Sequence, residues 1–504
     1  MNTPVYDWIA HHATYAPDSP AITDVASGRA LSYAQFDARI DRLAHHLRHR
    51  VGIQRGDRLS ILAANASEHF ELLFACRRLG AIFVPLNWRL ALPELRFIVA
   101  DAAPACLLVG EDFAEVGQAL AQSAPGLALL PLRYGAPSAY EDAIAQAPRL
   151  GVAEPLGFDD PWTILYTSGT TGRPKGAITT HGTAFFSSVN AIQKMQITAS
   201  SCGLTFMPLF HAGGLYLFAL WIFHFGGSNL VMRSFDAALA LALLADRQRG
   251  ISHLLGVPTQ FIMISELPDF AEADLSHVQS VTIGGAAAPV PLLEKYLRKG
   301  IVLQQGWGMT ETAAMATVLS KPEARKRIGS CGLPVLHTRL RVVDVDGQDV
   351  PPGATGELLI KGPTVTPGYW NRPEESARAF VDGWLRTGDA VRMDEDGYLY
   401  VVDRIKDMYI SGGENVYPLE VENVLHGLPQ VLEAAVVGIP DPKWGEVGRA
   451  FIVLRRPDSL SEAEVLAHCN ANLARFKVPR SIRFLAELPH NASGKLVKHM
   501  LPRD

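Results

Sequence analysis

The first part of the chain, up to about residue 160, alternates between two kinds of hydrophobic pattern. Residues 33–50 and 71–78 carry apolar side chains at the spacing of amphipathic helices, whereas residues 59–63 and 81–85 are short apolar runs typical of buried strands. The same rhythm returns between about residues 205 and 306. Helices that alternate with short buried strands predict parallel βαβ units, so we expect an α/β fold with two such sheets.

The pattern changes after about residue 332. Proline and glycine residues then separate short β segments such as residues 340–343 and 357–360. This pattern predicts a β-rich subdomain or small distorted β-barrel. From about residue 407 the pattern is typical of a compact α+β unit. The longest apolar run, residues 215–225, falls short of the roughly 20 residues that a membrane-spanning helix needs, so we expect a buried helix there.

Length and composition indicate a globular protein with several domains. The 504 residues are 48% hydrophobic and 19% charged, which suits about three domain-sized units. A formal net charge of −5 gives no basic footprint for nucleic acid. The amino terminus lacks the pattern of a signal peptide, and five scattered cysteines suit a reducing compartment, so we expect a cytoplasmic protein without a transmembrane segment.

One segment indicates chemistry more directly than any other: Tyr166-Thr-Ser-Gly-Thr-Thr-Gly-Arg-Pro-Lys175-Gly176. Its glycines let backbone N–H groups turn toward an anion, its hydroxyl groups add donors, and its lysine adds positive charge, which suits a polyphosphate. The Walker P-loop has another spacing and opens a helix directly. Here we expect a strand, a loop and a second strand, with a helix from about His181. Taken alone, a polar surface loop is the alternative.

Six further motifs stand in order with this segment. They are Met207-Pro-Leu-Phe-His-Ala-Gly-Gly214, Gly284-Gly-Ala-Ala-Ala-Pro289, Gly306-Trp-Gly-Met-Thr-Glu-Thr312, Gly383-Trp-Leu-Arg-Thr-Gly-Asp389, Asp403-Arg-Ile-Lys-Asp-Met-Tyr-Ile-Ser-Gly-Gly-Glu-Asn415 and Asn491-Ala-Ser-Gly-Lys495. Together they resemble the adenylate-forming superfamily, which comprises acyl-CoA synthetases, peptide-synthetase adenylation domains and firefly luciferase. The resemblance covers essentially the whole chain.

The resemblance implies an acyl-CoA synthetase that uses ATP, Mg²⁺ and coenzyme A. A carboxylate is a poor electrophile, so it is first converted to a mixed anhydride with AMP, with release of pyrophosphate, and the acyl group then passes to the thiol. Since carboxylate and triphosphate are both anions, the site has to supply cations and hydrogen-bond donors.

The resemblance also implies the nucleotide site. The β- and γ-phosphates would contact Thr167, Ser168, Gly169, Thr170, Thr171, Gly172 and Lys175, and Mg²⁺ would be held by Glu311 and Thr170, which offer hard oxygen ligands. Gly285, Ala286 and Ala287 would line the base pocket. Gly308, Met309 and Thr310 would complete the site, with Thr310 near the α-phosphate.

Five side chains in these motifs have further implied roles. Trp307 would stack on adenine where Tyr is more usual, with loss of a phenolic hydrogen bond, and a core aromatic is its alternative. Asp389 would accept both ribose hydroxyls beside Arg404, although alone it is typical of a turn. His211 resembles an aromatic gate between the ATP and acyl pockets, with a core histidine as the alternative. Lys495 resembles the lysine that bridges carboxylate and α-phosphate during adenylation.

In the family a small C-terminal domain rotates between the two half-reactions, because its lysine-bearing lid would otherwise obstruct the thiol. The resemblance implies an N-terminal AMP-binding domain over residues 1–403, a hinge over residues 404–406 and a mobile lid domain over residues 407–504. Lys406 would be the pivot. After rotation, the coenzyme A site would include Gly412 and Gly413 in the pantetheine tunnel and Phe476, Lys477 and Arg480 near the nucleotide, for which a solvated charged face is the alternative.

The expected acyl pocket is small and apolar: Phe210, His211, Ala212, Gly213, Leu215, Phe218, Gly306 and Gly308. It contains no lysine or arginine, which disfavours a dicarboxylate such as malonate, because the second charge would lack a partner. We predict a medium- or long-chain fatty acid as the substrate, with an aryl acid such as a cinnamate or benzoate as the second choice.

Three other functions stay open on the sequence. A stand-alone adenylation enzyme would load a carrier protein, and a luciferase-like enzyme would oxidise a special adenylate. A catalytically silent nucleotide-binding or membrane-surface protein would touch anionic lipid through basic residues at 247–249 and 321–327, although a net acidic chain gives peripheral membrane contact no support. We expect small-molecule partners, no nucleic acid, and a homodimer or monomer.

Overall fold

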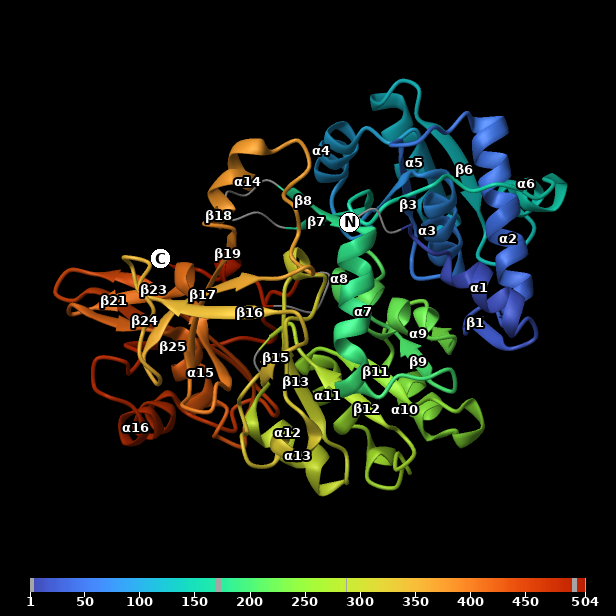
Figure 1. The fold of residues 1–504 in the computed structure, drawn as a ribbon. Helices are drawn as coiled ribbons and strands as arrows, with labels where there is room; N and C mark the ends of the chain where they lie inside the picture. Colours follow the sequence, from blue (N-terminus) through green and yellow to red (C-terminus); the bar gives the residue numbers. More distant parts are fainter. Residues whose placement is uncertain (1–3, 168–173, 287, 492–495, 504) are drawn as a thin grey trace.

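The structure is a computed structural model that describes residues 4–167, 174–286, 288–491 and 496–503 (Figure 1). The first sheet has six strands in the order β6-β5-β3-β4-β7-β8. Its strands are β3 (Arg58–Leu62), β4 (Ile82–Pro85), β5 (Cys106–Gly110), β6 (Ala128–Leu132), β7 (Pro161–Thr167) and β8 (Lys175–Thr180). All are parallel except β8, which is antiparallel to β7 and forms an edge of the sheet.

Helices connect these strands as the apolar pattern predicts. They are α2 (Tyr33–His46), α3 (Ser67–Leu79), α4 (Leu92–Ala102), α5 (Ala114–Ser123) and α6 (Ala139–Gln146). A capping box between Ser32 and Gln35 starts α2, because it satisfies backbone N–H groups that the first turn leaves unpaired. Every residue of α3 is buried, including its charged residues.

The second sheet has nine strands in the order β15-β14-β13-β12-β11-β9-β10-β1-β2. They are β1 (Pro20–Asp24), β2 (Ala30–Ser32), β9 (Cys202–Thr205), β10 (Ser228–Val231), β11 (His253–Gly256), β12 (Ser280–Ile283), β13 (Leu303–Trp307), β14 (Thr317–Val318) and β15 (Leu333–Pro334). The associated helices are α1 (Trp8–Tyr15), α7 (His181–Met195), α10 (Ala237–Ala245), α11 (Pro258–Ser265), α12 (Val290–Arg298) and α13 (Lys321–Ala324). The two predicted α/β sheets are therefore confirmed.

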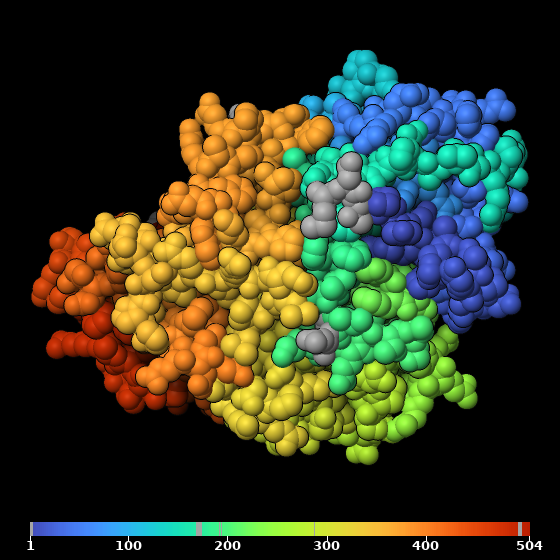
Figure 2. Space-filling model, viewed as in Figure 1, coloured from blue at the N-terminus to red at the C-terminus, as the bar shows by residue number. Residues whose placement is uncertain are grey.

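Two smaller sheets follow, as the change of pattern indicates. An antiparallel sheet contains β16 (Arg339–Val343), β17 (Thr355–Lys361), β18 (Phe380–Val381), β19 (Trp384–Met393) and β20 (Leu399–Arg404), with α14 (Pro373–Ala379). The last sheet contains β21 (Tyr409–Ser411), β22 (Glu414–Val416), β23 (Val431–Asp441), β24 (Gly445–Leu454) and β25 (Ser481–Phe484), with α15 (Pro418–Leu425) and α16 (Glu462–Asn472). The amino- and carboxy-terminal parts lie at opposite ends of the view in Figure 2.

Residues 215–225 are largely buried and helical, as predicted, but the helix is broken. α8 (Ala212–Leu215) and α9 (Trp221–His224) flank a π-helical turn, η3 (Tyr216–Leu220), inside which the backbone leaves helical geometry. Phe218 has a φ of +58°, which bulky residues rarely adopt. Apolar content predicted the burial of this run correctly, but it carries no information about where the backbone kinks. No helix in the described ranges is long and apolar enough to cross a bilayer.

Arg78 joins three helices in the first α/β layer. Its guanidinium, 4% exposed, lies 2.8 Å from Asp7, the N-cap of α1, and 2.5 Å and 3.3 Å from Asp37 and Asp41 of α2. Burial alone would raise the pKa of the Asp7 carboxyl, but the charges of Arg78 and Arg77 outweigh burial and lower that pKa. Arg78 of α3 thus supplies the positive charge that balances three largely buried carboxylates of the neighbouring helices.

Arg78→Met should destabilise this layer by about 3 kcal/mol, because three largely buried carboxylates would lose the guanidinium that they share, of which Asp37 and Asp41 would keep a second partner, Arg149. Thermal unfolding followed by circular dichroism measures the loss as a lower Tm. Arg378→Met is the control: its partner Glu374 and its own side chain are 81% and 76% exposed, so a change below about 1 kcal/mol is expected.

The difference between wild type and Arg78→Met should also depend on pH. A carboxyl whose pKa falls on folding adds stability above its unfolded pKa, near 3.8 for Asp7, and that stability is lost as the pH falls through the folded value. The Tm difference should therefore shrink below about pH 4. A difference that stays constant between about pH 7 and pH 3 would contradict the ion-pair assignment.

Candidate active site

The segment expected to bind polyphosphate has the predicted arrangement of strand, loop and strand. β7 ends at Thr167, β8 begins at Lys175, and the two residues are antiparallel partners. α7 then begins at His181, capped by Thr180, as predicted. Residues Ser168, Gly169, Thr170, Thr171 and Gly172 lie outside the described residues, so their contacts with phosphate stay a prediction.

The expected base-binding residues meet at one edge of the second sheet. β12 and β13 are parallel neighbours, with Ile283 opposite Gln305, so their carboxyl ends point the same way. Gly285 and Ala286 follow β12 and are exposed, and Trp307 ends β13. Ala287 lies outside the described residues. Ligands of open α/β sheets bind at this kind of edge.

Trp307, Asp389 and Arg404 are in direct contact. Trp307 Nε1 donates to Asp389 Oδ2 over 2.7 Å, and Arg404 Nε lies 2.6 Å from Oδ1 of the same carboxylate. Asp389 and Arg404 are opposite each other on β19 and β20. Asp389 is 2% exposed, whereas the Arg404 side chain is 44% exposed. A hydrogen bond and an ion pair thus hold this buried carboxylate, and the two partner residues come from different sheets.

The contact changes the interpretation of Trp307. The indole is 8% exposed and packs in a buried cluster with residues of the small antiparallel sheet. Its indole N–H donates to Asp389, the residue predicted to bind the ribose hydroxyls. The sequence did not suggest this contact. Stacking on adenine stays a prediction.

Glu311 is a buried carboxylate without a basic partner in the described part of the chain. It lies in the short 3₁₀ turn η6 (Thr310–Thr312), is 7% exposed, and accepts a hydrogen bond from Tyr369 Oη over 2.8 Å. Burial, and then the charge of Glu311, raise the pKa of Tyr369, so the phenol stays protonated and donates. Since a buried charge needs compensation, the position suits a cation, and an oxygen ligand suits Mg²⁺.

The predicted acyl-pocket residues lie around the start of the broken helix. Phe210, Ala212, Leu215 and Phe218 are buried, and His211 is the N-cap of α8 with its ring 4.7 Å from that of Phe210. Gly213, Gly306 and Gly308 belong to the predicted set too. A Cβ at Gly308 would lie 2.1 Å from the carbonyl oxygen of Ala314. Gly308 is therefore required by the packing of the turn after β13.

The expected coenzyme A residues separate into two groups. Gly412, with a φ of +62°, donates its N–H to the carbonyl of Trp444 over 2.8 Å, and the Arg480 guanidinium lies 6.0 Å from the Trp444 ring. Gly413 follows at a φ of +88°. Lys477 instead lies 2.7 Å from both oxygens of Glu420, and Phe476 packs against the core of the last sheet. Trp444 is 37% exposed, and sequence reasoning missed it.

The proposed hinge falls at a turn between two sheets. β20 ends at Arg404, and Lys406 is exposed in the turn η7 (Ile405–Asp407). Asp403, buried just before it, accepts hydrogen bonds from the backbone N–H groups of Arg404 and of Leu419 in α15. In this conformation α15 is thus held at the end of β20. Lys495 lies outside the described residues, so its role stays a prediction.

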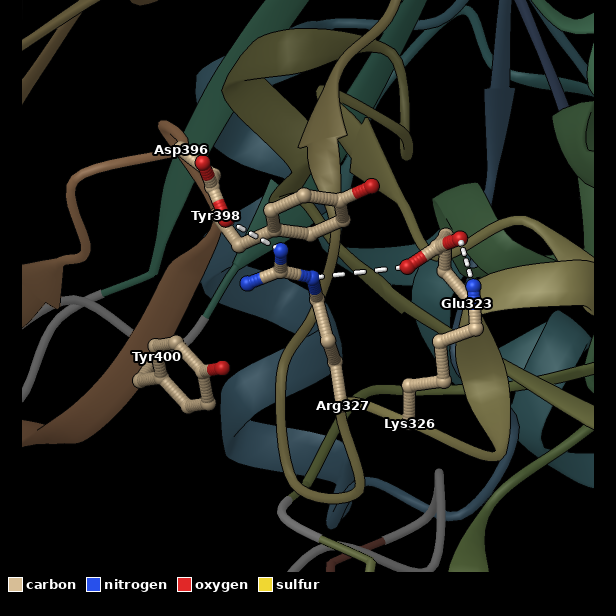
Figure 3. Close-up of a pocket in the computed structure, with 6 residues that line it drawn as sticks. All are labelled: Glu323, Lys326, Arg327, Asp396, Tyr398 and Tyr400. Carbon is tan, nitrogen blue, oxygen red and sulfur yellow. Dashed lines mark hydrogen bonds and ion pairs between the residues drawn. The ribbon is translucent and has the colours of Figure 1, made fainter.

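The basic segments considered for lipid contact are largely neutralised by ion pairs. Arg247 lies 2.5 Å from Asp274, and Arg249 lies 3.3 Å from Asp246. Arg327 pairs with Glu323, Asp394 and Asp396. It lies in a surface hollow of about 580 Å³, which is also lined by Glu323, Lys326, Asp396, Tyr398 and Tyr400 (Figure 3). This hollow is at the turn of the β19–β20 hairpin, away from the end that holds Asp389 and Arg404. It does not belong to the candidate active site.

Comparisons with known proteins identify the family of the chain. Residues 9–370 match the AMP-binding enzyme family, and residues 420–495 match the AMP-binding enzyme C-terminal domain. The feruloyl-CoA synthase of Amycolatopsis sp is 41% identical over 97% of both chains. The indoleacetate–CoA ligase of Aromatoleum aromaticum is 39% identical over 98% of this chain and 96% of that protein.

A solved structure agrees as well. The o-succinylbenzoate coenzyme A synthetase MenE of Bacillus subtilis, in complex with ATP and magnesium ion, superposes with a TM-score of 0.88, at 31% identity and over 99% of both chains. The resemblance of the ordered motifs to the adenylate-forming superfamily is thereby confirmed. The chain belongs to the AMP-binding enzyme family and is an ATP-dependent acid–CoA ligase.

Proposed function

We propose that the protein activates an aryl carboxylic acid as its acyl-adenylate and then transfers the acyl group to coenzyme A. The choice of acid rests on two relatives that match nearly the whole chain. Their names specify feruloyl and indoleacetate as the acyl groups. The predicted pocket fits such an acid, since it combines apolar residues with the rings of Phe210 and Phe218. The medium- or long-chain fatty acid stays an untested prediction.

Phe218 supports a ring-shaped substrate in another way. Its ring meets that of Trp221 edge to face, with centroids 5.8 Å apart, and meets His253 in the same manner at 5.4 Å. Packing from two sides, together with its unusual backbone conformation, fixes this ring. A fixed aromatic wall suits a flat, rigid acid better than a flexible chain, because the acid then loses little conformational freedom on binding.

In the first half-reaction each of the expected site residues would bind a different part of the substrates. Asp389 would accept the ribose hydroxyls, held in place by Trp307 and Arg404, and Lys175 would contact the outer phosphates. When bound, Mg²⁺ would neutralise phosphate charge and so lower the repulsion between the acid and the α-phosphate. Glu311 is the described residue that would hold it, together with Thr170. The carboxylate of the acid would be brought to the α-phosphate by Lys495.

In the second half-reaction the lid would present another face to the same site. Gly412 and Gly413 would admit the thin pantetheine chain. We add Trp444 to the proposed site, because its exposed ring and the neighbouring Arg480 offer a stacking surface and a positive charge for the nucleotide of coenzyme A. Lys477, paired with Glu420, would have to exchange that partner to take part.

A panel of acids tests the proposed substrate class. In a pyrophosphate-release assay with coenzyme A, hydroxycinnamates or arylacetates should reach a kcat/KM at least about 10-fold above saturated fatty acids of similar length. Malonate should be inactive, because its second charge would be buried without a partner. If a saturated chain is used as well as the best aryl acid, the aryl assignment is wrong.

Trp307→Phe tests the bond between the two sheets. Phe keeps an aromatic ring, although a smaller one, and lacks the N–H, so Asp389 loses a hydrogen bond to a charged group, of about 1.5–3 kcal/mol. The KM for ATP in pyrophosphate exchange should rise about 10-fold or more, and the preference for ATP over 2′-deoxy-ATP should shrink. Trp384→Phe, on the same strand as Asp389, should change neither quantity. An unchanged KM for ATP in Trp307→Phe would show that this hydrogen bond does not contribute to ribose binding.

Lys406→Pro tests the hinge, because proline fixes its own φ and restricts the preceding residue. Pyrophosphate exchange should stay within about 2-fold of wild type, whereas coenzyme A transfer from a synthetic acyl-adenylate should fall about 10-fold or more. Lys495→Ala should give the reverse pattern, loss of exchange with transfer largely kept. Equal losses in both assays for both variants would contradict a lid that serves the two steps separately.

A further inference from the structure

One residue outside the recognised motifs contacts both ends of the expected MgATP site. Tyr369 Oη donates to Glu311 Oε1 over 2.8 Å, and the Tyr369 ring centroid lies 5.5 Å from Lys175 Nζ. Lys175 is the expected triphosphate cation, and Glu311 is the expected ligand of Mg²⁺. Tyr369 therefore contacts both the expected ligand of Mg²⁺ and the expected cation for the triphosphate.

The backbone around Tyr369 extends the first sheet. Tyr369 is an antiparallel partner of Ala177 in β8, Ile178 N donates to Gly368 O over 3.1 Å, and Trp370 N donates to Gly176 O over 2.8 Å. Figure 1 shows α14, which follows this segment, near β7 and β8. Since β8 is an edge strand, the segment satisfies backbone groups that would otherwise stay unpaired.

Contacts on both sides of Tyr369 fix the segment further. Thr366 N donates to the backbone carbonyl of Glu311 over 2.7 Å, so the turn η6 is joined to the segment twice. Arg372 pairs with Asp101 at the end of α4 over 2.8 Å, and Tyr369 N donates to Ser376 Oγ over 2.8 Å. The segment that carries Tyr369 is thus held by contacts with β8, η6, α4 and α14.

The hydrogen bond leaves one side of the carboxylate for another partner. Oε1 of Glu311 accepts from Tyr369, and no side chain in the described ranges donates to Oε2. A neutral donor does not cancel the charge of the carboxylate, so its attraction for a cation is kept, while its rotation is restricted. The ring face of the same tyrosine offers Lys175 a cation–π contact that orients the ammonium group.

We propose that Tyr369 is a positioning residue, which orients Glu311 toward the metal of MgATP through its hydroxyl group and steadies Lys175 through its ring. The inference rests on the proposed function, in which Glu311 holds Mg²⁺. The two parts of the tyrosine have different roles. The hydroxyl group affects metal binding through Glu311, and the ring affects triphosphate binding through Lys175.

Tyr369→Phe removes the hydroxyl and keeps the ring. The Mg²⁺ concentration at half-maximal binding of a non-hydrolysable ATP analogue, measured by titration calorimetry, should rise about 10-fold. At saturating Mg²⁺ the KM for ATP should return close to the wild-type value. Tyr369→Leu removes the ring as well, so its KM for ATP should stay raised at saturating Mg²⁺.

Tyr140→Phe is the matched control. Tyr140 Oη also donates to a carboxylate, Glu71 Oε2 over 2.5 Å, but it does so in the buried contact between α6 and α3. This variant should lower Tm without a change in the Mg²⁺ midpoint, which distinguishes lost stability from lost metal positioning.

Glu311→Gln separates the inference from the function on which it rests. If Glu311→Gln removes the Mg²⁺ dependence of analogue binding and Tyr369→Phe leaves the midpoint unchanged, the role of Tyr369 is overturned and the metal site stands. If Glu311→Gln itself leaves the midpoint unchanged, Glu311 does not hold the metal, and both proposals fail. In the Glu311→Gln background, Tyr369→Phe should not change analogue binding further at any Mg²⁺ concentration.

Discussion

The candidate active site depends on carboxylates that the fold buries where its sheets meet. Asp389 and Glu311 are 2% and 7% exposed, and removing such charges from water is costly unless other groups compensate. Asp389 is compensated within the protein, by an indole N–H and a guanidinium. Glu311 receives a neutral phenol, which satisfies one oxygen and leaves the charge. In the proposed function, this difference would suit the two side chains to different partners, an uncharged diol for Asp389 and a cation for Glu311.

These contacts also explain how separate sheets build one site. Trp307 ends a strand of the nine-stranded sheet, Asp389 lies in the small antiparallel sheet, and Tyr369 pairs with the edge of the six-stranded sheet. The bond from Trp307 to Asp389 crosses from one sheet to another, and the bond from Tyr369 to Glu311 joins the segment beside β8 to the turn that follows β13. Because an unpaired buried polar group is costly, these bonds constrain how the sheets sit against one another as well as the orientation of the ligand-binding groups.

Most of the fold was predictable because apolar spacing reports burial directly. The helix at residues 33–50 and the strands at 59–63 and 81–85 lie where the pattern indicated. The kink at Phe218 was not predictable, since it depends on tertiary packing. The motifs identified Trp307, Asp389 and Glu311, but not the bond from Trp307 to Asp389, because sequence order does not show which residues of different sheets meet. Tyr369 and Trp444 were missed for the same reason.

Arg404 connects the nucleotide site to the proposed hinge. It holds Asp389 from the last residue of β20, and the turn that contains Lys406 begins at the next residue. Asp403, on its other side, accepts the backbone N–H of Leu419 at the start of α15. Two adjacent side chains therefore face opposite ways, one toward the predicted ribose ligand and one toward the lid. A rotation about Lys406 would have to break the contact of Asp403 with α15, whereas the pair of Arg404 with Asp389 lies on the stationary side. In the proposed mechanism, Asp389 would thus stay in place while the lid changes the face that it presents.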